Sequence, residues 1–416
     1  MNEYDVVVAG AGPGGATVAA SLAASGYQVA LLERGRHPVP HLPETWFPRD
    51  AALLDALGVD GIEKAFLDQA EVHFYNASGD FGLRLRLECV SHEGDRPVRL
   101  NRSIFDEILV RHATACGAEY AAEHTVTQVD MTSESAPVLE CQTPTGPRLV
   151  RGRLLVDASG KSGLVANRLG LKTRVEKLDP RVAVFSHFMG RRWNDVLPEN
   201  AMAVIGLEEG YLFVIPLTGD RISVGIVVPE ALAQAHEGKM QDLFTAQLQK
   251  SSLAGKILSD ATRVLPVIPA LNHSYVCDQV AGPGYCIVGE AGAFLDPFFS
   301  NGVTIALKTG LLAASAIQEV LATPSPERQR TVQDAYNGAF RQLILTEKSR
   351  AYERFQQPDY RQFLMACADP HLPMFLPLAL LMPSYARAAN PGGELPDLQR
   401  MLRSARDAFI DPRGAA

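Results

Sequence analysis

The 416-residue sequence predicts an α/β fold that combines a parallel sheet, an antiparallel sheet and a C-terminal helical region. The chain begins with an apolar strand, a helix and a second apolar strand, which is typical of a parallel α/β unit. Short strand-like runs separated by turn residues dominate residues 175–276, and helical periodicity begins near residue 326. We therefore assign residues 1–174 and 277–325 to the parallel unit, 175–276 to the antiparallel unit and 326–416 to the helical region.

The composition is that of an ordinary globular protein and narrows the partner classes. The net charge of −8 argues against nucleic acid or an anionic membrane as the main partner. Six cysteines without a CxxC pair and ten histidines outside zinc spacing predict reduced thiols, no metal site and a cytoplasmic location. No apolar run approaches the ~18 residues of a membrane span, and the acidic N-terminus does not resemble a signal peptide.

The first strand, "YDVVVAG", runs directly into a glycine-rich turn. Gly10, Gly12 and Gly15 follow in GxGxxG order. In this motif the first glycine permits the tight turn, the second lets the backbone approach a pyrophosphate, and the third lets the helix pack against the strand. Because the strand, the glycines and a helix occur in the right order, we predict a dinucleotide site.

The segment after the glycines indicates which dinucleotide the site binds. It is rich in alanine and ends at Gly26, and the N-terminal amides of such a helix would face the diphosphate. Glu33 ends the second strand, where it can accept hydrogen bonds from both ribose hydroxyls and disfavours a 2′-phosphate. NADP is therefore disfavoured, and FAD and NAD remain. The predicted contacts of this turn are Gly10, Gly12, Pro13, Gly14, Gly15, Glu33 and Arg34.

Two later segments distinguish FAD from NAD. Residues 153–163, "RLLVDASGKSG", form a strand that enters a small-residue turn through Asp157. Residues 284–317 form a strand, a Gly-Glu turn, a proline-containing loop and a helix. With these segments the chain resembles the glutathione-reductase-type FAD-binding fold, specifically the para-hydroxybenzoate-hydroxylase-like flavoproteins. The resemblance implies a Rossmann-like FAD-binding domain, with the antiparallel sheet as substrate domain.

The resemblance also implies further cofactor contacts. In that superfamily a Gly-Asp turn binds the ribityl chain of the flavin, whereas this chain has Gly289-Glu290, which is one methylene longer. The following loop and helix place backbone amides beside the isoalloxazine, and an arginine-plus-helix element at residues 99–113 places Arg102 near the flavin. The implied contacts are Arg102, Asp157, Gly289, Glu290, Pro297, Asn301, Gly302 and Val303.

No second GxGxxG follows the first, so the sequence predicts no dedicated NAD(P)H domain. We expect reduced flavin to be supplied by NAD(P)H directly or by a partner flavin reductase.

Three segments resemble the flavin-dependent halogenases more specifically: residues 39–48, 180–190 and 294–307. The sequence departs from that branch at the WxWxIP signature, where "YLFVIP" places Tyr211 and Phe213 instead of both tryptophans.

A second departure concerns the lysine that relays hypohalite in halogenases. Our placement puts Asp68 at this position, and a carboxylate cannot form a haloamine. Lys64, four residues away, is the alternative relay.

These departures favour an FAD-dependent monooxygenase that hydroxylates an electron-rich aromatic, free or tethered to a carrier protein or peptide. It would use molecular oxygen through a flavin C4a-hydroperoxide, which needs water exclusion and an oriented substrate rather than a protein nucleophile. A halogenase with altered motifs, a prenyl-reductase-type flavoprotein and a non-enzymatic flavin protein remain alternatives.

Candidate active-site residues follow from their positions in these segments. His187 is a candidate base for a phenol. Glu44 could hydrogen-bond flavin or substrate. The loop at residues 297–302 should line the flavin. Packing within the sheet or capping of a loop is the simpler explanation for several of them. The catalytic candidates are His187, Glu44, Ser300 and Asn301, and the substrate candidates are Tyr211, Phe213 and Phe299.

Overall fold

The computed structural model describes residues 2–37, 41–42, 44–46, 51–80, 82–86, 98–131, 136–174, 181–237, 239–272, 274–295 and 301–356. Pro297, Phe299, Ser300 and the predicted region after residue 356 lie outside these ranges. The chain divides into two compact units. Unit 1 comprises Met1–Phe66, Leu100–Arg174 and Ser274–Glu347, and unit 2 comprises Leu67–Arg99, Val175–His273 and Lys348–Ala416.

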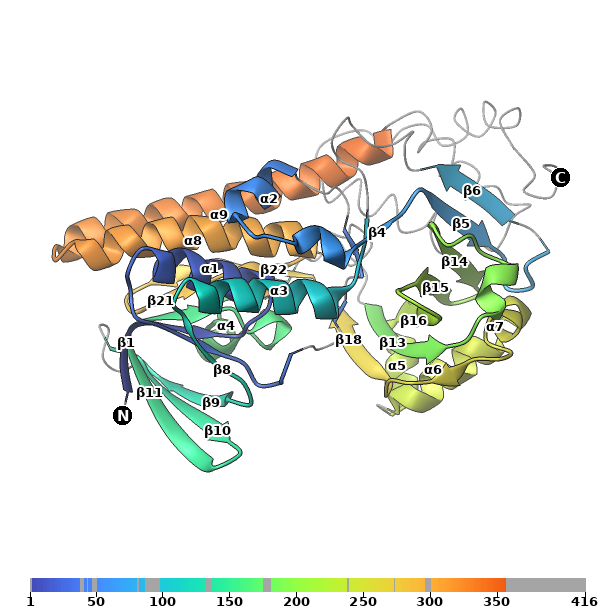
Figure 1. The fold of residues 1–416 in the computed structure, drawn as a ribbon, viewed down its shortest axis with the longest axis horizontal. Helices are drawn as coiled ribbons and strands as arrows, with labels where there is room; N and C mark the ends of the chain where they lie inside the picture. Colours follow the sequence, from blue (N-terminus) through green and yellow to red (C-terminus); the bar gives the residue numbers. More distant parts are fainter. Residues whose placement is uncertain are drawn as a thin grey trace. The chain divides into compact units, whose positions relative to one another are not determined.

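Unit 1 contains the predicted parallel sheet, in the strand order β20-β21-β11-β1-β2-β8 (Figure 1). The strands are β1 (Asn2–Ala9), β2 (Val29–Leu32), β8 (Glu119–Ala121), β11 (Gly146–Asp157), β20 (Ala281–Gly282) and β21 (Tyr285–Ile287). All of these pairs are parallel except β20 with β21. Val6, Val7 and Val8 are fully buried, as expected when both faces of a parallel strand are covered. An antiparallel extension of β9 (Thr125–Asp130) and β10 (Val138–Thr143) pairs with the start of β11.

Three helices pack together in unit 1. Helix α1 (Pro13–Ala24) contacts both α3 (Arg102–Ala115) and α8 (Gly302–Ala322). As predicted, α1 ends just before Gly26, whose φ is +87°. Helix α8 is, among the described helices, the one long and apolar enough to cross a membrane, by length and composition only. Its packing against α1 accounts for the apolar composition of α8, because a helix in the core of a domain is as apolar as one that crosses a membrane.

Helix α9 (Pro326–Gln356) begins where the sequence predicts it, and in Figure 1 it runs beside α8. Its Tyr336 hydroxyl donates a hydrogen bond of 2.8 Å to the carbonyl of Ile287 on β21. The remaining elements that lie in unit 1 or at its ends are β3 (Thr45–Trp46), α2 (Ala51–Leu57), η1 (Ile62–Ala65), β4 (Phe66–Asp68), β7 (Val98–Leu100), η3 (Gly160–Ser162), α4 (Leu164–Arg168), β12 (Lys172–Arg174), β19 (Tyr275–Cys277), η5 (Gly289–Ala291) and β22 (Ala293–Phe294).

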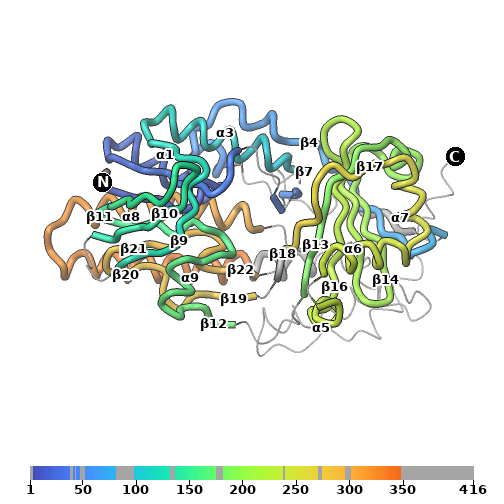
Figure 2. The backbone as a smooth tube through the Cα atoms, turned by 90° about the horizontal axis from the view of Figure 1, so that it is seen from below, coloured from blue at the N-terminus to red at the C-terminus, as the bar shows by residue number. Residues whose placement is uncertain are grey.

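Unit 2 contains the predicted antiparallel sheet, in the order β17-β13-β16-β15-β14-β5-β6, with β18 also pairing with β13 (Figure 2). The strands are β5 (Glu71–Tyr75), β6 (Gly82–Arg86), β13 (Arg181–Met189), β14 (Ala201–Leu207), β15 (Gly210–Pro216), β16 (Arg221–Pro229), β17 (Thr262–Arg263) and β18 (Ile268–Asn272). The hairpin between β15 and β16 turns at Gly219, where φ is +68°. Strand β6 ends the strand order of this sheet, while β5 joins β14 in parallel.

One prediction for unit 2 was incomplete. Residues 175–276 were expected to form strands alone, but three helices follow β16: α5 (Glu230–Ala235), α6 (Met240–Gln249) and α7 (Ser252–Ile257). A short 3-10 turn, η4 (Arg192–Asp195), follows β13. The even-numbered residues of β13, β15 and β16 form a core with residues such as Leu243, Phe244 and Leu253. The helices are needed because the even-numbered face of β16, from Ile222 to Val228, is apolar, and an uncovered apolar face would cost free energy.

Candidate functional site

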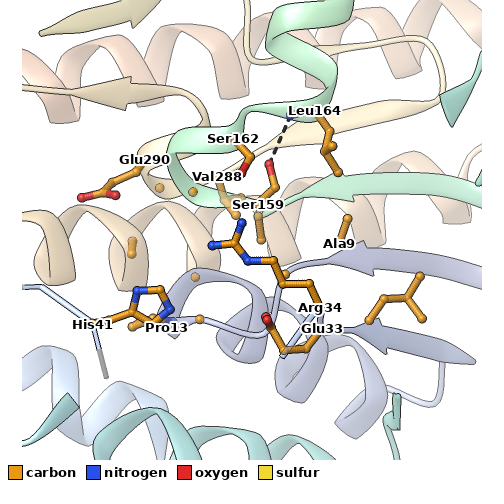
Figure 3. A pocket seen from close by; sticks show the side chains of 18 of the residues that line it. Ala9, Pro13, Glu33, Arg34, His41, Ser159, Ser162, Leu164, Val288 and Glu290 are labelled. Carbon is orange, nitrogen blue, oxygen red and sulfur yellow. Dashed lines mark hydrogen bonds between the residues drawn. The ribbon is translucent and has the colours of Figure 1, made fainter. Parts of the chain in front are cut away.

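Unit 1 holds a cavity of ≈ 240 Å³ beside the carboxyl ends of β1, β2 and β11 (Figure 3). This is the end of a parallel sheet at which α/β proteins bind ligands. The cavity is lined by Ala9, Gly10, Gly12, Pro13, Gly14, Leu32, Glu33, Arg34, His41, Leu42, Arg102, His124, Thr125, Val126, Ala158, Ser159, Gly160, Ser162, Leu164, Val288, Gly289, Glu290, Gly302, Val303 and Ala306.

The three glycines of the first turn differ in what a side chain would contact at each position. Gly10 has φ of +108°, and a Cβ there would lie 2.3 Å from the carbonyl oxygen of Ala158. A Cβ on Gly15 would lie 1.9 Å from the carbonyl oxygen of Gly10. A Cβ on Gly12 would meet no protein atom within 4 Å, although Gly12 lines the cavity. The fold therefore requires the first and third glycines, while the space beside the second is left for a ligand.

Helix α1 begins at this turn and directs its first amides toward the cavity. Gly12 is the N-cap, and no side chain caps the helix. The first-turn amides are therefore available to a ligand, and the positive end of the helix dipole favours an anion there. This end of the cavity fits a diphosphate.

Glu33 lines the cavity with a carboxylate that the backbone holds in place. Its Oε2 accepts a hydrogen bond of 2.9 Å from the amide of Ala11, and its Oε1 accepts one of 2.9 Å from Gly35. Arg34 follows in the cavity wall. A carboxylate retains lone pairs after these contacts, so Glu33 can still accept from ribose hydroxyls.

Asp157 is held by hydrogen bonds within its own turn. It was predicted to contact the cofactor, but it is fully buried and is absent from the cavity wall. It accepts hydrogen bonds from the amides of Ser159 (3.1 Å) and Val165 (2.7 Å) and from the Ser159 hydroxyl (2.5 Å). Burial raises its pKa against the opposing effect of these bonds. Asp157 therefore shapes the turn whose Ala158, Ser159 and Gly160 line the cavity.

The turn after Asp157 is also held by a hydrogen bond between two other residues, which is drawn in Figure 3. The Ser159 hydroxyl accepts it from the amide of Leu164 at 3.1 Å, and both residues line the cavity.

Arg102 lies in the cavity wall, as the resemblance implies, and is 7% exposed. Its Nε and Nη2 donate to the two oxygens of Asp106 at 2.9 and 2.8 Å, and its Nη1 donates to the carbonyl of Leu42 at 2.9 Å. Burial disfavours the guanidinium charge, but Asp106, with smaller contributions from Glu290 and Glu44, leaves the pKa of Arg102 raised. Arg102 is therefore a fixed cation in the wall rather than a solvated helix-start residue.

His41 also lines the cavity and was not predicted. Burial, followed by the charge of Arg102, lowers its pKa to about 4, so the imidazole is neutral at neutral pH. Its segment, residues 39–48, was noted only for its family resemblance. The other unpredicted lining residues, among them Leu42, His124, Thr125, Val126 and Ser162, come from loops and strand ends that tertiary structure brings together.

The opposite end of the cavity is formed by the Gly289-Glu290 turn and the start of α8. Gly289 has φ of +58°, and its amide donates to the Thr309 hydroxyl at 2.9 Å. Glu290, Gly302 and Val303 line the cavity, as the resemblance implies. Figure 3 labels Glu290 on one side of the cavity and Glu33 on the other.

Two further candidates are buried and are not among the residues that line the cavity. Asn301 is the N-cap of α8 and is 4% exposed, and its side-chain Nδ2 has no hydrogen-bond partner among the residues that the structure describes. Glu44 is 3% exposed, and its carbonyl accepts a hydrogen bond of 2.8 Å from the amide of Leu100. Their roles as catalytic groups stay predictions.

Trp46, which the sequence left without a role, connects the segment of β3 to α8. Its indole N–H donates to the Thr304 hydroxyl at 2.8 Å, and its ring packs edge-on against Phe66 and Phe105. Because Thr304 lies in the first turn of α8, Trp46 helps to position the residues that line this end of the cavity.

The remaining candidates lie in the sheet of unit 2. His187 on β13 pairs directly with Ser223 on β16 and is 3% exposed. Tyr211 and Phe213 on β15 are also buried. A Cβ on Gly225 would lie 2.0 Å from the Phe213 ring, so this glycine allows the ring to lie on β16. This is sheet packing, and the substrate and base roles stay predictions.

The two relay candidates are both exposed, and neither lines the cavity. The backbone carbonyl of Asp68 accepts hydrogen bonds from Arg99 at 3.2 and 2.9 Å. Lys64 lies in η1, with its Nζ 3.4 Å from the position that a Cβ on Gly61 would take. The lining residues that lie in the described part of the chain include no lysine.

The groups that line the cavity match the parts of FAD. The cavity offers an uncapped helix terminus and an open glycine for the diphosphate, Glu33 for the adenosine ribose, and a second end bounded by Glu290 and α8 for the rest of the cofactor.

Comparison with protein families agrees with this geometry. A family model described as an FAD binding domain matches residues 3–336. Tryptophan 2-halogenase of Chondromyces crocatus is 27% identical over 327 residues, which cover 76% of this chain and 61% of that protein. A 1H-pyrrole-2-carbonyl-[peptidyl-carrier protein] chlorinase of Pseudomonas fluorescens is 26% identical over 351 residues, 77% of each chain. This chain spans about three fifths of the length of the tryptophan halogenase.

Among solved structures, the flavin-dependent halogenase CmlS matches 97% of this chain and 70% of its own chain, with a TM-score of 0.69 and 23% identity. At this identity the match supports the fold. The predicted α/β class is confirmed by it and by the sheets described above.

Proposed function

The chain belongs to the FAD binding domain family, with FAD as its cofactor, and on that premise we propose that it is a halogenase-like oxidoreductase acting on an electron-rich aromatic. When bound, FAD supplies the chemistry that couples its reduced form and molecular oxygen to oxidation of a substrate. The observation that carries the proposal is the continuous cavity from the glycine turn to Glu290 in a chain whose relatives are named as halogenases.

We propose halogenation as the leading reaction, although the sequence alone favoured hydroxylation. The named substrates of two relatives, tryptophan and a carrier-bound pyrrole, contain electron-rich rings. The name of the second relative, which includes a peptidyl-carrier protein, supports the proposal that the substrate of this chain is tethered to a carrier protein.

Hydroxylation is the second candidate, and one observation favours it. Lys64 and Asp68 are exposed, and none of the described residues that line the cavity is a lysine. Without a lysine amine that captures hypohalous acid as a haloamine, oxygen transfer to the substrate would be the simpler outcome.

In either reaction the chain's own residues bind and orient the cofactor. The amides of the α1 turn and Glu33 would hold the diphosphate and ribose, and Arg102, which Asp106 fixes, would set a positive charge beside the cofactor. The sheet of unit 2 is the proposed source of substrate contacts, through Tyr211, Phe213 and His187. Reduced flavin would come from NAD(P)H directly or from a separate flavin reductase, in the cytoplasm.

Product analysis distinguishes the two reactions. The FAD-loaded protein is supplied with a flavin reductase, NADH, labelled oxygen, and chloride or bromide, and with tryptophan, simple phenols or a carrier-bound pyrrole. We expect a halogen isotope pattern in the product mass spectrum. Gain of one labelled oxygen without halogen would establish the second candidate, and absence of both products across the panel would contradict the proposal.

Two variants test the relay within the same assay. If Lys64 is the relay, Lys64→Ala abolishes halogenation while Asp68→Ala retains it. Equal halogenation by both variants and the wild type would exclude both residues from the relay.

A further inference from the structure

The flavin end of the cavity contains a carboxylate at the start of a long helix. Glu290 lines the cavity, and its Oε1 lies 3.3 Å from the position that a Cβ would take on Gly302, the first residue of α8. Unlike Glu33, the Glu290 carboxylate accepts no hydrogen bond from any residue that the structure describes. Its charge is therefore not committed to holding the protein backbone. The Arg102 guanidinium and the Tyr275 hydroxyl face this charge, which contributes to the raised pKa of each.

The start of α8 would otherwise favour a negative charge in the cavity. The unpaired amides of a first turn carry a partial positive charge, and no side chain caps α8. Gly302 and Val303 in this turn line the cavity. The full negative charge of Glu290 at this position opposes that effect.

The groups at the Glu33 end of the cavity indicate which part of FAD would lie near Glu290. Glu33 and the glycine turn suit the adenosine ribose and the diphosphate, so the flavin end of the cofactor, its ribityl chain and the ring attached to it, would extend toward Glu290, on the other side of the cavity in Figure 3. Two-electron reduction adds two electrons and either one proton, which leaves the ring anionic, or two protons, which leave it neutral. A nearby carboxylate disfavours the anionic product, and more strongly once the cofactor has displaced water from the cavity.

We propose that Glu290 tunes the bound flavin: its carboxylate lowers the two-electron reduction potential and keeps the reduced flavin protonated to higher pH. The proposal rests on FAD binding and not on whether the product is halogenated or hydroxylated. A lower potential makes reduced FAD a stronger reductant toward oxygen, which suits an enzyme whose reductant is supplied from elsewhere.

The test compares the FAD-loaded wild type with Glu290→Gln, which removes the charge and preserves the side-chain length. The potential is measured anaerobically by equilibration with dithionite and reference dyes. We expect the equilibrium constant for reduction to rise tenfold or more in Glu290→Gln, which corresponds to about 30 mV. In a pH titration of the reduced protein, followed by absorbance, ionisation of the flavin should move to lower pH. An unchanged or lower potential in this variant would overturn the proposal.

Glu319→Gln is the matched control, because it removes the same charge from an exposed position about 25 Å further along α8. Its potential should equal that of the wild type. An equal shift in both variants would mean a general charge effect and would also overturn the proposal. Thermal unfolding is measured in parallel, since a carboxylate that only stabilises the helix would change the melting temperature and not the potential.

Glu290→Asp keeps the proposal testable if Glu290→Gln does not retain FAD. The shorter side chain keeps the charge but withdraws it from α8, so the potential should rise by less than in Glu290→Gln. A fall or no change would contradict the proposal. Because these measurements use no substrate, failure of the product assay leaves them unaffected.

Discussion

The two ends of the cavity each present a glutamate, and the two carboxylates are held differently. Glu33 accepts hydrogen bonds from the amides of Ala11 and Gly35, which lie near it in sequence or across one strand pair. The Glu290 carboxylate accepts no hydrogen bond from the described residues. It lies beside Gly302, the first residue of α8. The adenosine end is thus organised before a ligand arrives, whereas the flavin end keeps a charge that can act on the ligand.

The largest expected effect concerns the adenosine end and comes from Gly12→Val. The new side chain meets no protein atom within 4 Å of its Cβ and projects into the space for the diphosphate. We expect a folded, colourless protein with FAD affinity lower by a factor of about 100 or more, about 2.8 kcal/mol. Absorbance after dialysis and a binding titration measure it.

Gly15→Ala is the matched control for this prediction. Its Cβ would lie 1.9 Å from the Gly10 carbonyl, so it should destabilise the fold itself. If Gly12→Val retained full FAD, the assignment of the glycine turn to the diphosphate would be wrong.

A smaller effect is expected from His41, which Figure 3 shows on the same side of the cavity as Glu290. Burial, followed by the charge of Arg102, lowers its pKa to about 4, against a value near 6.5 when unfolded. The stabilising contribution is therefore complete above the unfolded pKa and is lost as the pH falls from about 6.5 toward 4. Between pH 7.5 and pH 5 the FAD-free protein should lose about 2 kcal/mol of unfolding free energy from this group.

Urea unfolding at the two pH values measures this loss, with His41→Gln as the comparison. Glutamine does not titrate, so the variant should lose about 2 kcal/mol less than the wild type over the same interval. Equal losses in the two proteins would show that His41 is not held neutral by the cavity.

The smallest expected effect tests the two glutamates directly. Glu33→Gln replaces one accepting oxygen with an N–H donor opposite a backbone amide, which should cost about 1 kcal/mol. Glu290→Gln breaks no hydrogen bond to a described residue and should change stability by less than about 0.5 kcal/mol. Thermal unfolding of the FAD-free proteins measures both, and equal losses would contradict the distinction between the two ends.

The sequence predicted the first half of the site well, because its signals are local. Gly10, Gly12, Gly15 and Glu33 lie within one strand–helix–strand unit, and the geometry of a parallel pair brings them together wherever the motif occurs. The predicted cofactor contact of Asp157 stays a prediction, since a carboxylate after a strand can bind either a ligand or its own turn. The three hydrogen bonds that Asp157 accepts, from Ser159 and Val165, show that it serves the turn.

The prediction for unit 2 was less complete for a different reason. Runs of apolar residues in β13 and β16 indicate buried strands without saying what covers them. Helices α5, α6 and α7 cover one face, and Phe213 lies over Gly225 on the other. An aromatic residue that packs in a sheet and one that contacts a substrate have the same pattern in sequence.

The sequence by itself determined the parallel sheet, the glycine turn and the antiparallel second unit, because periodicity and local backbone geometry are properties of short segments. The choice of FAD over NAD came from the resemblance of two later segments to a known flavoprotein family. Tertiary structure alone decided that His41 joins Arg102 in the cavity wall, that Trp46 positions α8, and that the Glu290 carboxylate reaches Gly302. Each of these depends on groups far apart in the chain, whose burial and distance set their charge and hydrogen bonding, and neither quantity exists until the chain has folded.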